Sequence, residues 1–282
     1  MRSLNFESNT PLLYLVPTPI GNMQEVSPRM LEVISSVDLI ACEDTRVTGK
    51  LLSILGFKKE LVSLREHNEI SESQNIVKKI LSGVKVAYMS DAGYPCISDP
   101  GSKLVKICLE NGINVAPISG PNAALNALVA SGLCEDHFYF HGFLSAKESA
   151  RIEELKTVAH KKETLIFYEA PHRIQKTLES LYEILGNRKA CIARELTKKH
   201  EEFIREPLGE LVKIDPATLI GEMVIVVEGA SGEEKPIVEN SDLVNMVKSL
   251  VESGMSTKDA IKKVSEMTNI NKNTIYKLVH LN

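Results

Sequence analysis

The sequence predicts an α/β fold with two α/β domains and a small helical segment at the C-terminus, and three observations lead to this prediction. Short β-branched runs alternate with segments of helical period, which is typical of strands and helices around a mostly parallel sheet. The 282 residues suffice for about two domains, at roughly 100 to 200 residues per domain. A polar segment without periodicity, at 230–241, precedes three short helical patterns and indicates a linker.

The first domain is predicted at 12–121, after an N-terminal tail at 1–11. Its strands are the β-branched runs at 12–16, 38–42, 61–64, 85–90 and 113–118. Ser27 and Pro28 supply the N-cap and the first residue of a helix. Ser71 has the spacing of a capping box and is expected to begin another helix. Two further helices are expected at 45–55 and 101–111.

The second domain is predicted at 122–229, and its sheet is expected to be mixed. Helices are expected at 122–131, 151–158 and 172–185, and strands at 138–143, 164–168, 190–195, 203–211 and 222–228. Only a turn at Asp215 and Pro216 is expected between the last two strands, so the later strands of this domain are expected to be antiparallel. The small helical domain is predicted at 242–282, with helices at 243–251, 257–267 and 273–279.

Composition excludes several classes of protein. The 33 basic and 37 acidic side chains give a net charge of −4, which disfavours a diffuse basic surface for nucleic acid. Residues 230–282 hold seven Lys and seven Asp or Glu, so the helices there are not expected to bind DNA. Five cysteines without a C-x-x-C pair argue against a disulfide framework or a zinc ribbon. With no signal-peptide pattern and no apolar run of about 18 residues, a cytoplasmic protein is expected.

The loops that follow the strands are the candidate sites, because ligands of open α/β sheets bind outside the carboxyl ends of the strands. Four loops are unusual in length or composition: 17–22, 43–46, 90–101 and 119–123. None carries a phosphate loop or a G-x-G-x-x-G pattern, which disfavours a nucleotide triphosphatase and an ordinary dinucleotide dehydrogenase. A structural alternative is an N-cap at Asp44 or Thr45, with Arg46 as its solvated partner.

Basic side chains in the second domain have two interpretations. His172 and Arg173 begin a helix, where the helix dipole disfavours positive charge. A charged substrate would account for them, and exposed side chains are the alternative. His137 and His141 lie four residues apart without an acidic third ligand, so no metal site is expected. Two basic segments are expected to be solvated, or to contact an RNA backbone: 161–162 and 198–200.

Six segments occur in a fixed order along the chain: LVPTPIGN, ACEDTR, LREHNE, SDAGYPCISDPG, PISGPNAAL and FYEAPHR. Together they resemble the tetrapyrrole-methylase superfamily, and specifically its 16S rRNA (cytidine-2′-O)-methyltransferase branch. The resemblance spans residues 12–229 and is specific as an ordered set. Precorrin and uroporphyrinogen methyltransferases share that fold but typically carry a G-P-G-D-P loop, where this chain has Pro17-Thr18-Pro19-Ile20-Gly21.

The resemblance implies two α/β/α domains of the tetrapyrrole-methylase type. It implies that S-adenosylmethionine binds in the cleft between them and leaves as S-adenosylhomocysteine, without a metal. The implied substrate is 16S rRNA in the small ribosomal subunit, methylated on the ribose of cytidine 1402 in the decoding centre. The implied oligomer is a homodimer, and neither DNA nor a membrane is an expected partner.

Methyl transfer from a sulfonium is an in-line displacement, which needs alignment and a dry pocket more than a strong acid or a metal. From the resemblance, the cofactor is expected to contact Pro17, Thr18, Asp91, Gly93, Pro95, Ile97, Ser98, Asp99, Ser119, Ala123, Tyr168, Glu222 and Met223. A ribose hydroxyl is a poor nucleophile, so a base or a polarising cation should lie near it. The catalytic residues are expected to be Glu43, Asp44, Arg46 and His67, with Asp44 or His67 as the base. Substrate contacts are expected at Asn68, Glu169 and Arg173.

Two other functions stay open at this point. A small-molecule methyltransferase of the same fold would act on a tetrapyrrole, methylate precorrins and leave ribosomal subunits unchanged. A non-enzymatic binding protein would use the C-terminal helices to read nucleic acid, and predicts specific duplex binding by residues 236–282.

Overall fold

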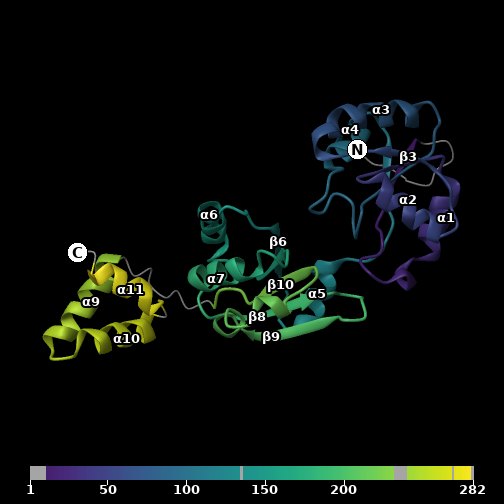
Figure 1. Cartoon of the computed structure of the whole chain (residues 1–282). Helices are drawn as coiled ribbons and strands as arrows, with labels where there is room; N and C mark the ends of the chain where they lie inside the picture. The colour runs from purple at the N-terminus through teal and green to yellow at the C-terminus, as the bar shows by residue number, and fades with distance from the viewer. Residues whose placement is uncertain (1–10, 134–135, 232–239, 269, 281–282) are drawn as a thin grey trace. The chain divides into compact units, whose positions relative to one another are not determined.

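The computed structural model of the chain describes residues 11–133, 136–231, 240–268 and 270–280 (Figure 1). Contacts divide the chain into two compact units. Unit 1 takes the residues up to 126 together with Leu196–Lys199, and unit 2 takes the rest. Each unit has its own five-stranded sheet and its own apolar core.

The sheet of unit 1 is parallel, in the order β3-β2-β4-β1-β5. Its strands are β1 (Leu12–Val16), β2 (Leu39–Cys42), β3 (Glu60–Ser63), β4 (Val86–Met89) and β5 (Asn114–Pro117). Its helices are α1 (Pro28–Ser36), α2 (Thr45–Ile54), α3 (Glu69–Leu81) and α4 (Ser102–Glu110), with α5 (Ala123–Ser131) following β5. A short 3-10 turn, η1 (Met23–Glu25), follows the loop after β1. The predicted alternation of strands and helices is confirmed.

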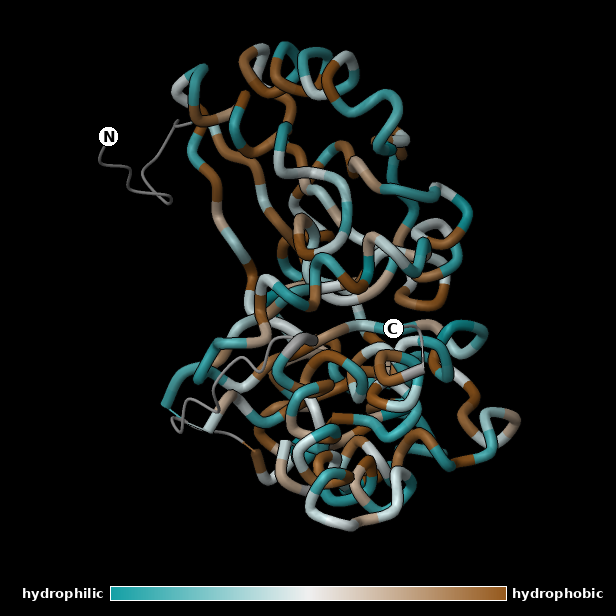
Figure 2. Tube along the Cα trace, turned by 90° about the vertical axis from the view of Figure 1, so that its left-hand side faces the viewer, coloured by the Kyte–Doolittle hydropathy of each residue, from teal (hydrophilic) through white to brown (hydrophobic). Residues whose placement is uncertain are grey.

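Helices cover both faces of this sheet, because every residue of β2 and β4 is buried. Along β4, Val86 and Tyr88 pack in the cluster that includes α3 and α4. Ala87 and Met89 pack in the cluster that includes α1 and α2. Figure 2 shows brown and teal alternating along the helices at the top of the view, as expected for helices with one buried face.

Caps decide where these helices begin. The Ser27 hydroxyl accepts a hydrogen bond from the backbone N–H of Met30 (3.1 Å), as predicted. The expected start at Ser71 is wrong, because α3 begins at Glu69. A 3-10 turn, η2 (Glu66–Asn68), leads directly into α3, and Ser71 lies inside the first turn, where its hydroxyl donates to the carbonyl oxygen of Asn68 (3.0 Å).

The sheet of unit 2 is mixed, in the order β6-β7-β10-β8-β9, which confirms the prediction. Its strands are β6 (Phe138–Phe143), β7 (Thr164–Glu169), β8 (Lys189–Arg194), β9 (Glu202–Pro207) and β10 (Met223–Val227). Only β6 and β7 pair in parallel, and the other pairs are antiparallel. The helices α6 (Glu148–Val158) and α7 (Ile174–Leu185) pack on one apolar cluster of this sheet.

The predicted strand at 203–211 is too long. The strand β9 ends at Pro207, and α8 (Leu208–Leu211) follows it. Leu208 and Leu211, three residues apart, lie on one side of this helical turn and are both fully buried in the core. The predicted turn at Asp215 is confirmed as a 3-10 turn, η3 (Pro216–Thr218), whose N-terminus the Asp215 carboxylate caps.

Three C-terminal helices form a small cluster of their own. They are α9 (Asn240–Glu252), α10 (Thr257–Thr268) and α11 (Lys272–His280). Leu243 and Val247 of α9 pack with Ile261 and Val264 of α10 and with Ile275 of α11. Residues 1–10 of the predicted tail and 232–239 of the predicted linker lie outside the described residues. Among the residues that the structure describes, no helix has the length and hydropathy that a membrane span requires.

Candidate functional site

The candidate site of unit 1 lies at the carboxyl edge of its sheet. All five strands are parallel, so the loops that follow them leave at the same edge. These loops carry most of the predicted site residues: Pro17 and Thr18 after β1; Glu43, Asp44 and Arg46 after β2; His67 and Asn68 after β3; Asp91, Gly93, Pro95, Ile97, Ser98 and Asp99 after β4; and Ser119 after β5. Ala123 begins α5.

The loops after β1 and β4 are bonded to each other. The backbone N–H of Thr18 donates to the carbonyl oxygen of Gly93 (2.9 Å), and the N–H of Gly93 donates back to Thr18 (3.0 Å). The Thr18 hydroxyl donates to the carbonyl oxygen of Ser90 (3.1 Å), and both side chains are buried. The backbone at this point is therefore fixed without any ligand.

A hollow of about 130 Å³ adjoins these bonded loops. Its lining is mostly apolar, with one carboxylate, and consists of Pro19, Gly21, Met23, Val47, Thr48, Leu51, Ser90 and Asp91. The side chain of Lys198 packs over Gly21, because a Cβ added to this glycine would lie 2.5 Å from the Lys198 Cγ. The basic segment 198–200 thus contributes one side chain to this edge.

Three carboxyl groups at this edge bind protons more tightly than usual. Burial, together with the charges of Glu43 and Asp91, raises the pKa of Asp99 to about 7. Burial raises the pKa of Glu43, and the charge of Asp91 adds to the increase. Burial also raises the pKa of Asp91, against the hydrogen bond that the backbone N–H of Asp44 donates to it (3.3 Å). A cation would relieve this repulsion.

Asp44 differs from these three groups. Its carboxylate accepts hydrogen bonds from the backbone N–H of Arg46 (2.8 Å) and from the Arg46 Nε (3.0 Å). These bonds hold the pKa of Asp44 well below its usual range. Asp44 is also the N-cap of α2, so the capping interpretation is confirmed. Such a carboxylate has little affinity for a proton at neutral pH, which weakens it as a general base.

The loop 90–101 holds an unusual backbone. Cys96 and Ser98 have φ values of 70° and 62°, in the left-handed region that side chains rarely adopt. Strain of this kind is found mainly where the surrounding structure and a functional role require it.

Glu69, which was not among the predicted site residues, holds the far end of this loop. The backbone N–H groups of Gly101 and Lys103 donate to the Glu69 Oε1 (2.9 and 3.0 Å), and the Lys103 ammonium lies 3.1 Å from Oε2. Burial raises the pKa of Glu69, but these bonds outweigh it and lower the value. The Tyr88 hydroxyl donates to the carbonyl oxygen of Pro100 (2.7 Å). The one sequence feature that pointed to a role for Glu69 is its position at the end of the LREHNE segment.

The remaining predicted residues belong to unit 2. Tyr168 and Glu169 end β7, and Glu222 and Met223 lie where β10 begins. Met223 pairs with Glu169 in the antiparallel register, so these residues meet at one end of the unit 2 sheet. Arg173 follows as the N-cap of α7.

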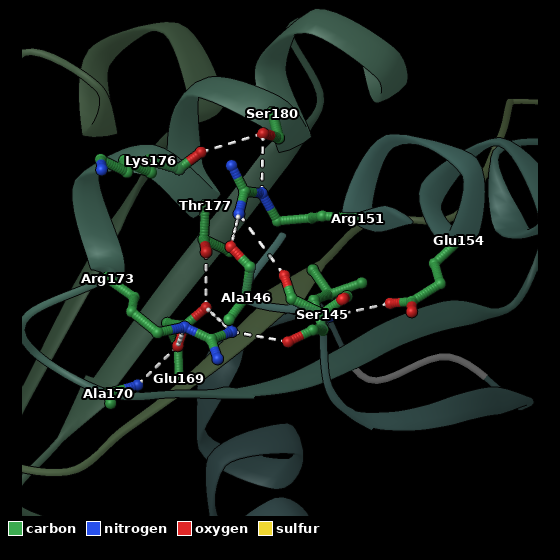
Figure 3. Close-up of polar contacts among 11 residues, drawn as sticks. Ser145, Ala146, Arg151, Glu154, Glu169, Ala170, Arg173, Lys176, Thr177 and Ser180 are labelled. Atoms are coloured by element: carbon green, nitrogen blue, oxygen red, sulfur yellow. Dashed lines mark hydrogen bonds and ion pairs between the residues drawn. The ribbon is translucent and has the colours of Figure 1, made fainter. Parts of the chain in front are cut away.

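Glu169 and Arg173 have partners within the protein (Figure 3). The Glu169 side chain is fully buried, and its carboxylate lies 3.0 Å from the Arg173 Nε. It also accepts hydrogen bonds from the N–H of Ala170 (2.8 Å) and the hydroxyl of Thr177 (2.5 Å). This internal ion pair accounts for the basic residue at the helix start without a charged substrate, and a substrate contact by either residue stays a prediction.

Cys42, Cys96, Cys108 and Cys191 are free thiols. Among the residues that the structure describes, no group of three His, Cys, Asp or Glu side chains could hold a metal ion.

Comparisons with known proteins agree with this architecture. The model of the family described as Tetrapyrrole (Corrin/Porphyrin) Methylases matches residues 12–212. The "Ribosomal RNA small subunit methyltransferase I" of Bacillus subtilis (strain 168) is 42% identical over 284 residues, covering 99% of this chain and 97% of its own. The protein of the same name from Escherichia coli O157:H7 is 43% identical over 269 residues, covering 94% and 93%.

Solved structures support the fold. The methyltransferase CobJ aligns with a TM-score of 0.58 at 18% identity, over 78% of this chain and 95% of its own. Diphthine synthase aligns with a TM-score of 0.58 at 16% identity, over 77% and 90%. At these identities the likeness concerns the fold alone.

Proposed function

The chain belongs to the tetrapyrrole (corrin/porphyrin) methylase family, and from this membership we propose that it transfers a methyl group from S-adenosylmethionine to the RNA of the small ribosomal subunit. The observation that carries the proposal is the identity of 42–43% to small-subunit rRNA methyltransferases over nearly the whole chain. The proposed target is the ribose 2′-oxygen of cytidine 1402 in 16S rRNA, and the proposed form is a cytoplasmic homodimer.

The residues at the carboxyl edge of unit 1 fit S-adenosylmethionine. This cofactor carries a sulfonium and an ammonium, and the edge offers the carboxyl groups of Glu43, Asp91 and Asp99, which repel one another. The mostly apolar hollow beside Asp91, about 130 Å³ in volume, would hold part of the cofactor. When bound, the cofactor supplies an electrophilic methyl group. The fixed backbone at Thr18 and Gly93 would hold it in line for displacement.

The other proposed contacts follow from the resemblance. From unit 1 they are Pro17, Pro95, Ile97, Ser98, Ser119 and Ala123, and from unit 2 they are Tyr168, Glu222 and Met223.

The base that accepts the ribose proton is proposed to be His67 rather than Asp44. Arg46 already satisfies the Asp44 carboxylate and lowers its pKa. His67 is exposed on the turn that follows β3, beside the loop after β2. A His67→Ala variant with full turnover would remove His67 from this role, and Asp44→Ala would test the alternative.

Cofactor affinity is expected to rise with pH through the titration of Asp99. With a pKa of about 7, this carboxyl is mostly protonated at pH 6 and mostly ionised at pH 7.5. The ionised form attracts the cationic cofactor, so the association constant should rise roughly eightfold between these values, while the cofactor amino group stays mostly protonated. Calorimetric titrations at several pH values measure this rise. Asp99→Asn should lose most of this rise, and the same rise in that variant would contradict the assignment.

The second candidate substrate is a tetrapyrrole, because the matching family model is described by that activity. Purified protein with labelled S-adenosylmethionine should be offered small ribosomal subunits and, separately, uroporphyrinogen or precorrins. The proposal expects label in the RNA alone. Label in the tetrapyrrole alone would replace the proposed substrate while keeping the cofactor.

A further inference from the structure

Several charged side chains form hydrogen bonds with the backbone of the loop that follows β6 (Figure 3). Residues 144–147 connect β6 to α6. The Arg173 guanidinium donates to the carbonyl oxygen of Leu144 (2.6 Å), and the backbone N–H of Ser145 donates to the Glu154 carboxylate (2.9 Å). The Arg151 Nη1 lies 3.4 Å from the carbonyl oxygens of both Ser145 and Ala146. Three charged side chains therefore fix this backbone.

The loop is fixed at an energetic cost. Arg151 is 3% exposed, and its described partners are these two carbonyl oxygens and the hydroxyl of Ser180 (2.9 Å), none of them a carboxylate. Burying a guanidinium with only neutral partners is unfavourable, and an apolar side chain would fill the same space more cheaply. The unfavourable burial of Arg151 has an explanation if this loop must hold a functional side chain in one fixed position.

The group presented at the end of this loop is Lys147. It is exposed, and it is the N-cap of α6 without a side-chain hydrogen bond to that helix. Ser, Thr, Asp and Asn are the residues that stabilise this position, and the helix dipole disfavours a cation there. A residue that violates the local preference at a rigid position suggests a role outside the fold.

An exposed aromatic side chain precedes the loop. Phe143 is 53% exposed, and its ring lies 5.5 Å from that of Tyr168, which also contacts Phe140 at 5.0 Å. A bulge between Phe140 and Gly142 shifts the register of β6. Without it, two residues three apart would point to opposite faces of the sheet, so the bulge brings Phe143 to the face of Phe140 and Tyr168.

We propose that Phe143 and Lys147 contact a single-stranded segment of the substrate RNA, the aromatic ring stacking on a base and the ammonium binding a backbone phosphate. Unstacked bases on aromatic rings beside a fixed cation are the usual contacts of single-stranded RNA. With a net charge of −4, the chain needs local cations for such a contact. Arg151, Glu154 and Arg173, which hold the backbone of the loop, then act as positioning residues. This inference rests on the proposed function, because it assumes an RNA substrate.

The test uses exposed side chains, so that folding is preserved. Lys147→Ala and Phe143→Ala are compared with Lys156→Ala, which removes a cation from the same helix, where Lys156 pairs with Glu153 (2.8 Å). Binding of small ribosomal subunits is measured at several salt concentrations, and binding of S-adenosylmethionine is measured in parallel. Lys147→Arg serves as the conservative replacement.

Lys147→Ala should weaken subunit binding and reduce the slope of log K against log salt by roughly 0.7 to 0.9, the loss of one phosphate contact. Phe143→Ala should weaken subunit binding by about 5- to 150-fold. Lys147→Arg and Lys156→Ala should keep the wild-type slope, and all variants should bind S-adenosylmethionine normally.

Two results would overturn this inference and leave the proposed function standing. One is wild-type affinity and slope in both alanine variants while the wild type methylates subunits. The other is a Phe143→Ala variant that loses cofactor affinity but not subunit affinity, which would assign this ring to the cofactor. A wild-type protein that binds subunits through Lys147 without methylating them would refute the proposed reaction and leave the contact standing. A wild-type protein that does not bind subunits refutes both.

Discussion

Replacing Gly101 with alanine is expected to lower the free energy of unfolding by about 3 kcal/mol or more and to abolish cofactor binding. Gly101 has a φ of +119°, which a side chain rarely adopts. An added Cβ would lie 2.2 Å from the Tyr88 ring and 2.9 Å from the Cys96 sulfur. Tyr88 is fully buried in β4 and cannot move aside. The loop 90–101 would therefore have to leave Glu69 and Tyr88, which hold its end.

The control for this variant lies at the other end of the same helix. Gly112 also has a positive φ, +71°, but an added Cβ would meet nothing within 4 Å. Gly112→Ala should cost only about 1 kcal/mol from the backbone conformation. Urea unfolding of both variants, with cofactor titration of each, measures the difference. Equal losses of stability would show that Tyr88 does not confine this loop.

Asp91→Asn is expected to raise the dissociation constant for S-adenosylmethionine by about 10- to 150-fold, since hydrogen bonds to a charged group contribute about 1.5–3 kcal/mol. Asp91 lines the hollow beside the bonded loops and faces the N-terminus of α2, where the N–H of Asp44 donates to it. Asparagine keeps an acceptor for that bond and removes only the charge. Folding should therefore be preserved while attraction for the cationic cofactor is lost.

Asp38→Asn is the matched control. Asp38 immediately precedes β2, and its carboxylate accepts a hydrogen bond from the backbone N–H of Lys85 (2.9 Å), ahead of β4. It thus lies at the amino edge of the same sheet, away from the proposed site. Its cofactor affinity should equal that of the wild type by calorimetry. If Asp91→Asn also binds normally, the carboxyl edge of unit 1 is not the cofactor site.

Local patterns in the sequence predict most of the strands and helices. The β-branched runs and the cap at Ser27 lie in short segments, and the sequence also predicted antiparallel strands at the end of unit 2. The absence of a helix before β10, on which that prediction depended, is not observed, because α8 follows β9, and β9 and β10 both pair with β8 rather than with each other. The errors arose where a neighbouring turn or a tertiary contact overrides a local signal. Ser71 has a capping spacing, but η2 already begins the turn that leads into α3. The run after Pro207 looks like strand, but the core takes Leu208 and Leu211 from a helical turn.

The candidate site was predictable only in part. The loops that form the site could be identified from the sequence, because parallel strands end at the same edge of the sheet whatever their order. The contacts that join them are long-range, such as the bond from Gly101 to Glu69, 32 residues apart. The sequence also places a cation at the start of α7 without revealing that Glu169 is its buried partner. Likewise, alternation alone cannot show the bulge that brings Phe143 beside Tyr168.

The most direct test of the central claim is the identity of the methylated nucleoside. Purified protein is incubated with isotopically labelled S-adenosylmethionine and small ribosomal subunits that lack the modification, and the digested rRNA is analysed by mass spectrometry. The account predicts label on 2′-O-methylcytidine at position 1402 of 16S rRNA. Label on a base, at another nucleotide or absent from RNA while the cofactor still binds would contradict it.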